Sequence, residues 1–111
     1  MAAVIVSALS ACSSASTQIG KGPRPASANE VVISGYKFVP QTLTVPVGTT
    51  VTWVNRDIAH HTVTRRFWGD EPFDSGKLSY EGVFSHTFRT AGSYSYLCVP
   101  HSGMQGTVVV Q

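Results

Sequence analysis

The chain has 111 residues, a formal net charge of +2, and charged side chains at 13% of its positions. This length predicts a single domain. A positive charge this small, with no basic run longer than Arg65-Arg66, gives no reason to expect a nucleic-acid partner. The two cysteines, Cys12 and Cys98, lie in dissimilar surroundings, and we do not expect them to form a disulfide.

The first 29 residues have a composition unlike the rest of the chain. Residues 1–11 are apolar and uncharged, too short to span a bilayer but typical of the apolar region of a secretory signal. Leu9-Ser10-Ala11-Cys12 resembles the lipobox of bacterial lipoproteins, in which the Cys receives a diacylglyceryl group, although no Lys or Arg precedes the apolar run. Residues 12–29 are rich in Ser, Thr, Gly and Pro and are predicted to be a flexible linker. We therefore expect a head held to a membrane by a lipid on Cys12; an ordinary cleaved signal and a tail with a free thiol are the alternatives.

From residue 30 onward the sequence has the pattern of short β-strands. Polar and apolar residues alternate over 41–45, and one face of 50–55 holds Val51, Trp53 and Asn55, while no stretch keeps a helical period. The expected strands are 31–34, 41–45, 50–55, 61–64, 83–89, 93–97 and 106–110, with a bend at 35–40 and irregular chain at 67–82. We predict an all-β domain over residues 30–111, a Greek-key β-sandwich or barrel of about seven to eight strands.

One short loop near the C-terminus gathers three side chains that can bind a metal. It reads Cys98-Val99-Pro100-His101-Ser102-Gly103-Met104 and joins the last two predicted strands. A buried thiol, a surface His and a core Met would each be ordinary alone, but their spacing on one turn favours a metal site. Soft sulfur donors with imidazole suit copper, and a His2Cys set with a weak axial Met is the arrangement of blue-copper electron-transfer sites. Zinc is the rival metal, but it seldom uses Met and usually binds a second Cys or further His.

The second histidine of such a set must come from another part of the chain. The segment before residue 62 offers His60 and His61. We choose His61, because it directly precedes a predicted strand and so has a fixed direction, and we expect His60 to be an exposed neighbour. His86 shares a strand face with two phenylalanines and is expected to be a structural histidine rather than a ligand.

With these residues in place, residues 30–111 resemble a small cupredoxin of the plastocyanin and amicyanin group. The matching stretches besides the ligand loop are Tyr36-Lys37-Phe38, Val45-Pro46-Val47-Gly48, Val51-Thr52-Trp53-Val54-Asn55-Arg56 and Ala91-Gly92-Ser93-Tyr94. The two-residue spacings on each side of His101 are similar to those of amicyanin, whereas plastocyanin has longer gaps. The resemblance implies one type 1 copper ion, Cu(I)/Cu(II), held by His61, Cys98 and His101, with Met104 as the weak axial ligand.

The chain departs from this group at three positions near the ligands. In the group the first His is typically followed by Asn and the Cys by Thr or Ser, whereas this chain has Thr62 and Val99. Gly103 stands where amicyanin has an apolar residue before the Met. The docking patch is therefore altered, and the resemblance does not extend to methylamine dehydrogenase as a partner.

The resemblance implies a single-electron carrier rather than an enzyme, because protein donors fill all four ligand positions and leave none for a substrate. Electrons would pass through His101. Phe67, Trp68, Arg65 and Arg66 either line the docking face or are ordinary loop packing. The donor and acceptor would be redox proteins met in transient encounters by a monomer, which favours small interfaces. The expected location is the periplasm or the extracytoplasmic face of a bacterial membrane.

Two other functions remain open from the sequence. The first is a copper-binding or copper-handling lipoprotein that uses the same ligands without an electron-transfer role. The second is a β-sandwich adhesion module that binds no metal. The first would differ from an electron carrier in copper lability and self-exchange rate, and the second would show no copper-dependent change in its spectrum or stability.

Overall fold

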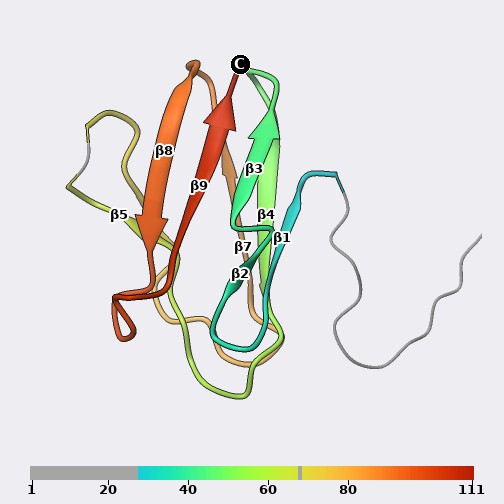
Figure 1. Ribbon diagram of the computed structural model, residues 1–111, viewed down its shortest axis with the longest axis vertical. Helices are drawn as coiled ribbons and strands as arrows, with labels where there is room; N and C mark the ends of the chain where they lie inside the picture. The colour runs from blue at the N-terminus through green and yellow to red at the C-terminus, as the bar shows by residue number, and fades with distance from the viewer. Residues whose placement is uncertain (1–27, 68) are drawn as a thin grey trace, which may run out of the picture.

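The computed structural model describes residues 28–67 and 69–111, which form two β-sheets packed against each other (Figure 1). One sheet has the strand order β2-β1-β4-β7 and the other has the order β3-β9-β8-β5-β6. The strands are β1 Glu30–Ile33, β2 Phe38–Val39, β3 Thr42–Val45, β4 Thr50–Asn55, β5 Thr64–Arg65, β6 Phe73–Asp74, β7 Val83–Thr87, β8 Gly92–Leu97 and β9 Gln105–Val110. The described residues contain no helix, and the prediction of an all-β sandwich is confirmed. Among these residues, no helix is long and apolar enough to cross a membrane.

The sheet pairing brings three loops to the same end of the sandwich. β1 and β4 run parallel, with Ile33 opposite Asn55, so the chain leaves both strands on one side. β8 and β9 are antiparallel, with Leu97 opposite Gln105 at that end and Gly92 opposite Val110 at the other. In Figure 1 the loops that follow β1, β4 and β8 gather below the sheets, whereas the C-terminus lies above them.

Both sheets bury their inner faces in one aromatic core. Trp53 of β4 is fully buried, and its ring centroid lies 5.5 Å from that of Tyr96 on β8 in the opposite sheet. Along β9 every second residue is buried, as expected for a strand with one face on a core. Gly106 belongs to this buried set, and a Cβ there would lie 2.4 Å from the Tyr96 hydroxyl oxygen. A glycine is therefore required where β9 passes the Tyr96 ring.

The structure adds short pairings that the sequence pattern did not predict. The expected bend at 35–40 contains β2, and the irregular stretch 67–82 contains β6. The expected strand at 61–64 is reduced to a single bridge between His61 and Leu78, followed by β5. The predicted signal segment, Cys12 and all but the last two residues of the predicted linker lie outside the described residues.

Candidate metal centre

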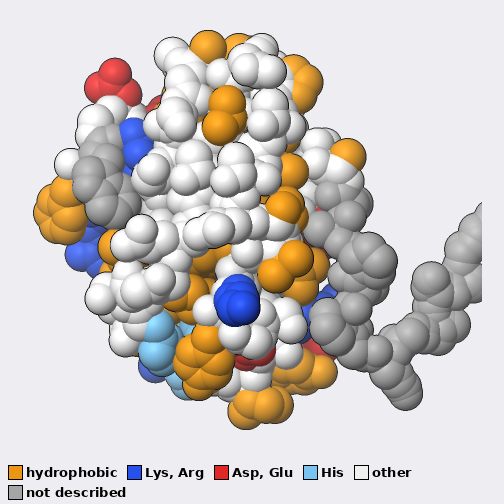
Figure 2. All heavy atoms as spheres, in the orientation of Figure 1, with side chains coloured by type: hydrophobic (Ala, Val, Ile, Leu, Met, Phe, Trp, Pro, Cys, Tyr) orange, Lys and Arg blue, Asp and Glu red, His pale blue; other side chains and the backbone are white. Residues whose placement is uncertain are grey.

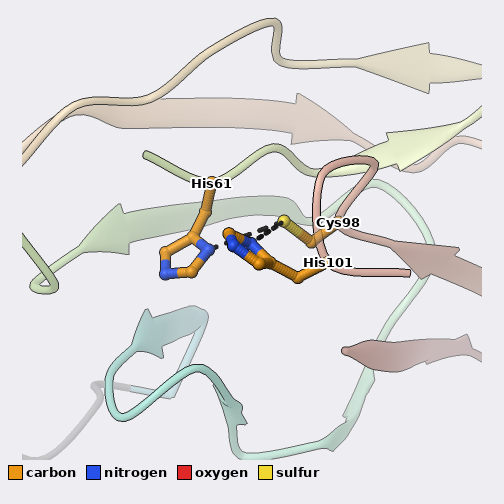
Figure 3. A group of neighbouring side chains, drawn as sticks. All are labelled: His61, Cys98 and His101. Atoms are coloured by element: carbon orange, nitrogen blue, oxygen red, sulfur yellow. Dashed lines mark hydrogen bonds between the residues drawn. The ribbon is translucent and has the colours of Figure 1, made fainter. Parts of the chain in front are cut away.

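Three potential metal donors converge at the loop end of the sandwich. The ligand atoms of His61, Cys98 and His101 all lie within 4.8 Å of one another. Cys98 Sγ is 3.5 Å from His61 Nδ1 and 3.6 Å from His101 Nδ1, so both imidazoles turn the same nitrogen toward the sulfur (Figure 3). His61 and Cys98 are fully buried, whereas His101 is partly exposed. The structure thus gathers three of the four predicted ligands into one cluster, of which His101 alone reaches the surface.

The loop between β8 and β9 is closed by its own backbone. The Cys98 N–H donates to the Met104 carbonyl at 3.0 Å, the His101 N–H donates to the Cys98 carbonyl at 3.2 Å, and the Met104 N–H donates to the His101 carbonyl at 2.8 Å. These bonds fold the seven-residue loop into a compact turn. Met104, the fourth predicted ligand, is 6% exposed and belongs to the hydrophobic core. The short spacing of Cys98, His101 and Met104 in the chain therefore brings these three side chains onto one turn.

The loop that carries His61 is held by the buried side chain of Asn55, at the end of β4. The Asn55 amide nitrogen donates to the Ala59 carbonyl at 3.0 Å and to the Leu78 carbonyl at 2.9 Å. Its oxygen accepts the Asp57 N–H at 2.9 Å. His61 and Leu78 also exchange two backbone hydrogen bonds, of 3.1 and 2.8 Å. The sequence pattern put Asn55 on the buried face, and a buried amide needs such partners.

Asp57 sets the direction of the His61 ring. Its carboxylate lies 2.9 Å from His61 Nε2 and accepts the N–H groups of Gly35 and Tyr36, each at 2.8 Å. Burial raises the pKa of Asp57, but the hydrogen bonds from Tyr36, Gly35 and His61 outweigh it, and the pKa lies below its ordinary value of 3.8. A carboxylate on one imidazole nitrogen fixes the tautomer and leaves the other nitrogen free for a metal. Sequence reasoning missed Asp57, because no local pattern marks its contacts with residues more than twenty positions away.

Thr62 links the two ligand loops. Its N–H lies 3.4 Å from Cys98 Sγ, and its hydroxyl oxygen accepts the Val99 N–H at 2.9 Å. Thr62 and Val99 are two of the three positions at which the chain departs from the residues typical of the plastocyanin and amicyanin group. The Thr62 side chain links the two ligand loops by binding the Val99 backbone N–H. This link does not depend on the Val99 side chain.

Other histidines lie outside this cluster. His60 is exposed, and it is not one of the three donors that converge among the described residues. His86 packs against the rings of Phe73 and Phe88, with centroids 4.7 Å away in each case, and its Nε2 lies 3.3 Å from the Glu71 carboxylate. These contacts agree with the prediction that His86 is structural.

Glu71 ties the loop between β5 and β6 to the body of the domain. Besides His86, its carboxylate accepts the Tyr94 hydroxyl at 3.0 Å and the Arg89 N–H at 3.5 Å. Burial raises the pKa of Glu71, but the hydrogen bonds from Tyr94, His86 and Arg89 outweigh this effect, and the pKa lies below its ordinary value of 4.5. Its carboxylate is therefore more stable ionised in the folded protein than in the unfolded chain.

The residues suggested for a docking face fall into different environments. Phe67 is 83% exposed. Arg65 is buried, donates to the Ser95 carbonyl at 3.1 Å and covers the Tyr94 ring, so it serves packing. Arg66 is paired with a carboxylate of β6 at 3.0 Å. Trp68 lies outside the described residues.

The donors fit copper better than other common metals. One cysteine sulfur and two imidazole nitrogens converge, and the same loop carries a buried thioether. A structural zinc site would draw four donors from Cys, His or carboxylate groups, and only three such donors meet among the described residues. An all-β sandwich with His2Cys donors at one end defines the class of small blue copper proteins.

Comparison with known proteins places the chain in a family. Residues 26–111 match the copper binding proteins of the plastocyanin/azurin family, and the chain belongs to it. Amicyanin from Paracoccus versutus is 35% identical over 78% of this chain and 67% of its own length. Halocyanin from Natronomonas pharaonis is 39% identical over 70% of this chain and 50% of its own length. A solved structure of an amicyanin variant in the reduced Cu(I) form is 36% identical, with a TM-score of 0.70 over 84% of this chain and 86% of that one.

Membership of this family confirms several predictions. The resemblance to the plastocyanin and amicyanin group and the copper cofactor are confirmed. The chain is a blue copper electron carrier and not an enzyme. It spans between half and two thirds of the length of the two relatives described above.

Proposed function

We propose that His61, Cys98 and His101 hold the copper ion, with Met104 as a weak axial ligand, and that the chain carries single electrons between protein partners. The observation that carries this proposal is the convergence of two imidazole nitrogens on one buried sulfur. Copper bound by these donors would supply a one-electron couple between Cu(I) and Cu(II).

The protein's own residues hold the donors in place. Asn55 holds the loop that carries His61, and Asp57 orients the His61 ring. Thr62 links this loop to the loop that carries Cys98. Cys98 and His61 are shut off from water. Donors that are held in this way need little rearrangement when the charge of the site changes by one, which favours electron transfer over delivery of the metal to another protein.

His101 is the place where a partner would approach. It is the one partly exposed residue of the three converging donors. Exposed apolar side chains sit on the three loops at this end of the sandwich, with Tyr36 51%, Ile58 81% and Val99 47% exposed. Figure 2 shows histidine atoms at the surface beside hydrophobic side chains at this end of the molecule. We infer a small, largely apolar docking face for transient redox partners, which suits a monomer.

The proposed location is the periplasm or the extracytoplasmic face of a bacterial membrane, with a lipid on Cys12. This rests on the apolar residues 1–11 and the lipobox-like sequence before Cys12. Mass spectrometry of the mature protein from a bacterial host tests it. A polypeptide that begins at Cys12 and carries a lipid is expected; an unmodified N-terminus at another residue would remove the lipid anchor.

The ligand set is tested by adding Cu(II) to the purified protein and recording visible and EPR spectra. An intense visible band with a small copper hyperfine splitting is expected. Cys98→Ser should abolish the band and His61→Ala should greatly weaken it. The matched control His60→Ala changes the adjacent histidine and should keep the band.

Two results would redirect the proposal. A band that survives in His61→Ala and is lost in His60→Ala would exchange the two histidines. A weak band with ordinary splitting in the unsubstituted protein would mean that Cys98 is not a ligand, and would favour copper handling without electron transfer.

A further inference from the structure

The turn that joins β1 and β2 places an aromatic residue in a backbone conformation that aromatic residues avoid. Ser34 and Lys37 exchange two backbone hydrogen bonds, of 3.0 and 3.2 Å, around Gly35 and Tyr36. Both central residues have positive φ, 63° at Gly35 and 61° at Tyr36. A two-residue hairpin turn with positive φ at both positions is type I′, which prefers Asn or Gly. A bulky residue there is strained, and such strain tends to mark functional sites.

A single carboxylate keeps Tyr36 in this conformation. Asp57 Oδ1 accepts the Gly35 N–H and Oδ2 accepts the Tyr36 N–H, each at 2.8 Å. The same Oδ2 lies 2.9 Å from His61 Nε2. The strained turn and the ring of a candidate ligand therefore share one anchor.

The side chain of Tyr36 lies against both candidate histidine ligands. Its ring centroid is 5.0 Å from that of His61 and 4.9 Å from that of His101, with interplanar angles of 88° and 78°. Edge-to-face contacts of this kind are favourable and depend on orientation. The Tyr36 side chain is otherwise half exposed.

His101 depends on this contact more than His61 does. His61 is enclosed by the core and bonded to Asp57. Within residues 28–67 and 69–111, the ring of His101 touches only two other rings, those of Tyr36 and His61, and its one side-chain polar contact is with Cys98 Sγ. Without Tyr36, the ring of His61 would be the one ring left beside the His101 imidazole within these described residues.

We propose that Tyr36 is a positioning residue that holds the imidazole of His101 in the orientation needed for metal binding. Asp57 keeps Tyr36 in the strained turn, so that one carboxylate orients both imidazoles, His61 directly and His101 through the tyrosine ring. This inference rests on the proposed ligand set. It gives the strained aromatic residue a role that the turn alone does not require.

The test substitutes Tyr36 in two ways and uses a matched tyrosine as control. Tyr36→Phe keeps the ring and should behave as the unsubstituted protein. Tyr36→Asn removes the ring but places a residue that type I′ turns prefer, so the variant is expected to fold. Tyr80→Asn makes the same change at a tyrosine of equal exposure, 52%, that contacts neither imidazole.

The first readout is the order of the His101 ring in the metal-free protein, measured by NMR relaxation of its ring carbons. The second is the rate of copper release to a chelator from the loaded protein. Tyr36→Asn should lower the ring order and speed release about tenfold, as is typical when a group that supports a ligand is removed. Tyr36→Phe and Tyr80→Asn should change release by less than about twofold.

A Tyr36→Asn variant with unchanged ring order and unchanged copper release would overturn the inference. So would a Tyr36→Phe variant as disturbed as Tyr36→Asn, because the ring is then not what positions His101. If the unsubstituted protein gives no intense visible band with Cu(II), the ligand set has failed instead. The metal-free NMR measurement still decides whether Tyr36 orders the histidine.

Discussion

Replacing Asn55 by Leu tests whether one buried amide holds the loop of His61. The substitution keeps the size of the side chain and removes three hydrogen bonds, to the Ala59 carbonyl, the Leu78 carbonyl and the Asp57 N–H. The Leu78 carbonyl would still accept the His61 N–H at 3.1 Å. The Ala59 carbonyl and the Asp57 N–H would each lose the partner described above.

The expected cost follows from these bonds. A hydrogen bond contributes about 1 kcal/mol net, and groups left unsatisfied raise that figure, so the free energy of unfolding should fall by about 3 kcal/mol. For a domain of this size, that corresponds to a fall in Tm of about 15 °C. Urea denaturation of the metal-free protein, followed by circular dichroism, measures the change without interference from copper binding.

The control lies on the same strand. Thr52→Val removes an exposed hydroxyl contact with Ser85 and should cost less than about 0.5 kcal/mol. If Asn55→Leu also costs less than about 0.5 kcal/mol, the amide does not hold the loop. The order of the His61 ring would then depend on Asp57 and the Leu78 bridge alone.

Three further predictions concern other parts of the fold. Glu71→Gln should lower the free energy of unfolding by about 1 kcal/mol at neutral pH. Because the pKa of Glu71 is lowered in the folded protein, this difference in stability should be present above pH 4.5 and should disappear as the pH falls through the folded pKa. Urea titrations at several pH values measure it. Gly106→Ala should destabilise the protein by about 2 kcal/mol, because the new Cβ meets the fixed Tyr96 ring. Thr62→Val should cost about 1 kcal/mol by removing the acceptor of the Val99 N–H, and Thr62→Ser should restore most of it.

Each of these has an outcome that contradicts it. A Glu71→Gln difference that persists unchanged at low pH would mean that the carboxylate charge contributes nothing to stability. A Gly106→Ala variant as stable as the original would show that the Tyr96 ring can move aside. A Thr62→Ser variant as unstable as Thr62→Val would place the effect in packing rather than in the hydroxyl.

Strands β8 and β9 could be predicted from the sequence because each has one face on the core. β8 and β9 alternate between buried and exposed residues over much of their length, and this period of two is visible in the chain. β2, β5 and β6 have two residues each, and two residues carry no period. β2 pairs with the longer β1, β5 pairs with the longer β8, and β6 pairs with β5, so each forms where a neighbouring strand offers a hydrogen-bonding edge.

The candidate site could be predicted where its donors are close in the chain. Cys98 and His101 lie on one turn, and the sequence favours His61 because it directly precedes a predicted strand. In the structure, the bridge to Leu78 fixes the direction of the chain at His61. The residues that orient these donors could not be predicted. Asp57 meets Tyr36 across 21 positions of the chain, and no pattern within either segment encodes that contact.

The arrangement of the strands has a consequence for immobilising the protein. Val110 ends β9 opposite Gly92, at the end of the sandwich far from the three loops, and β1 runs toward those loops from Glu30. A tether attached at the end of β9 or before the start of β1 would therefore be joined at the end of the sandwich opposite His101. Attached through a tag at Gln111 to an electrode, or through its N-terminal side to a vesicle, the protein would present the proposed docking face around His101 outward to the solution.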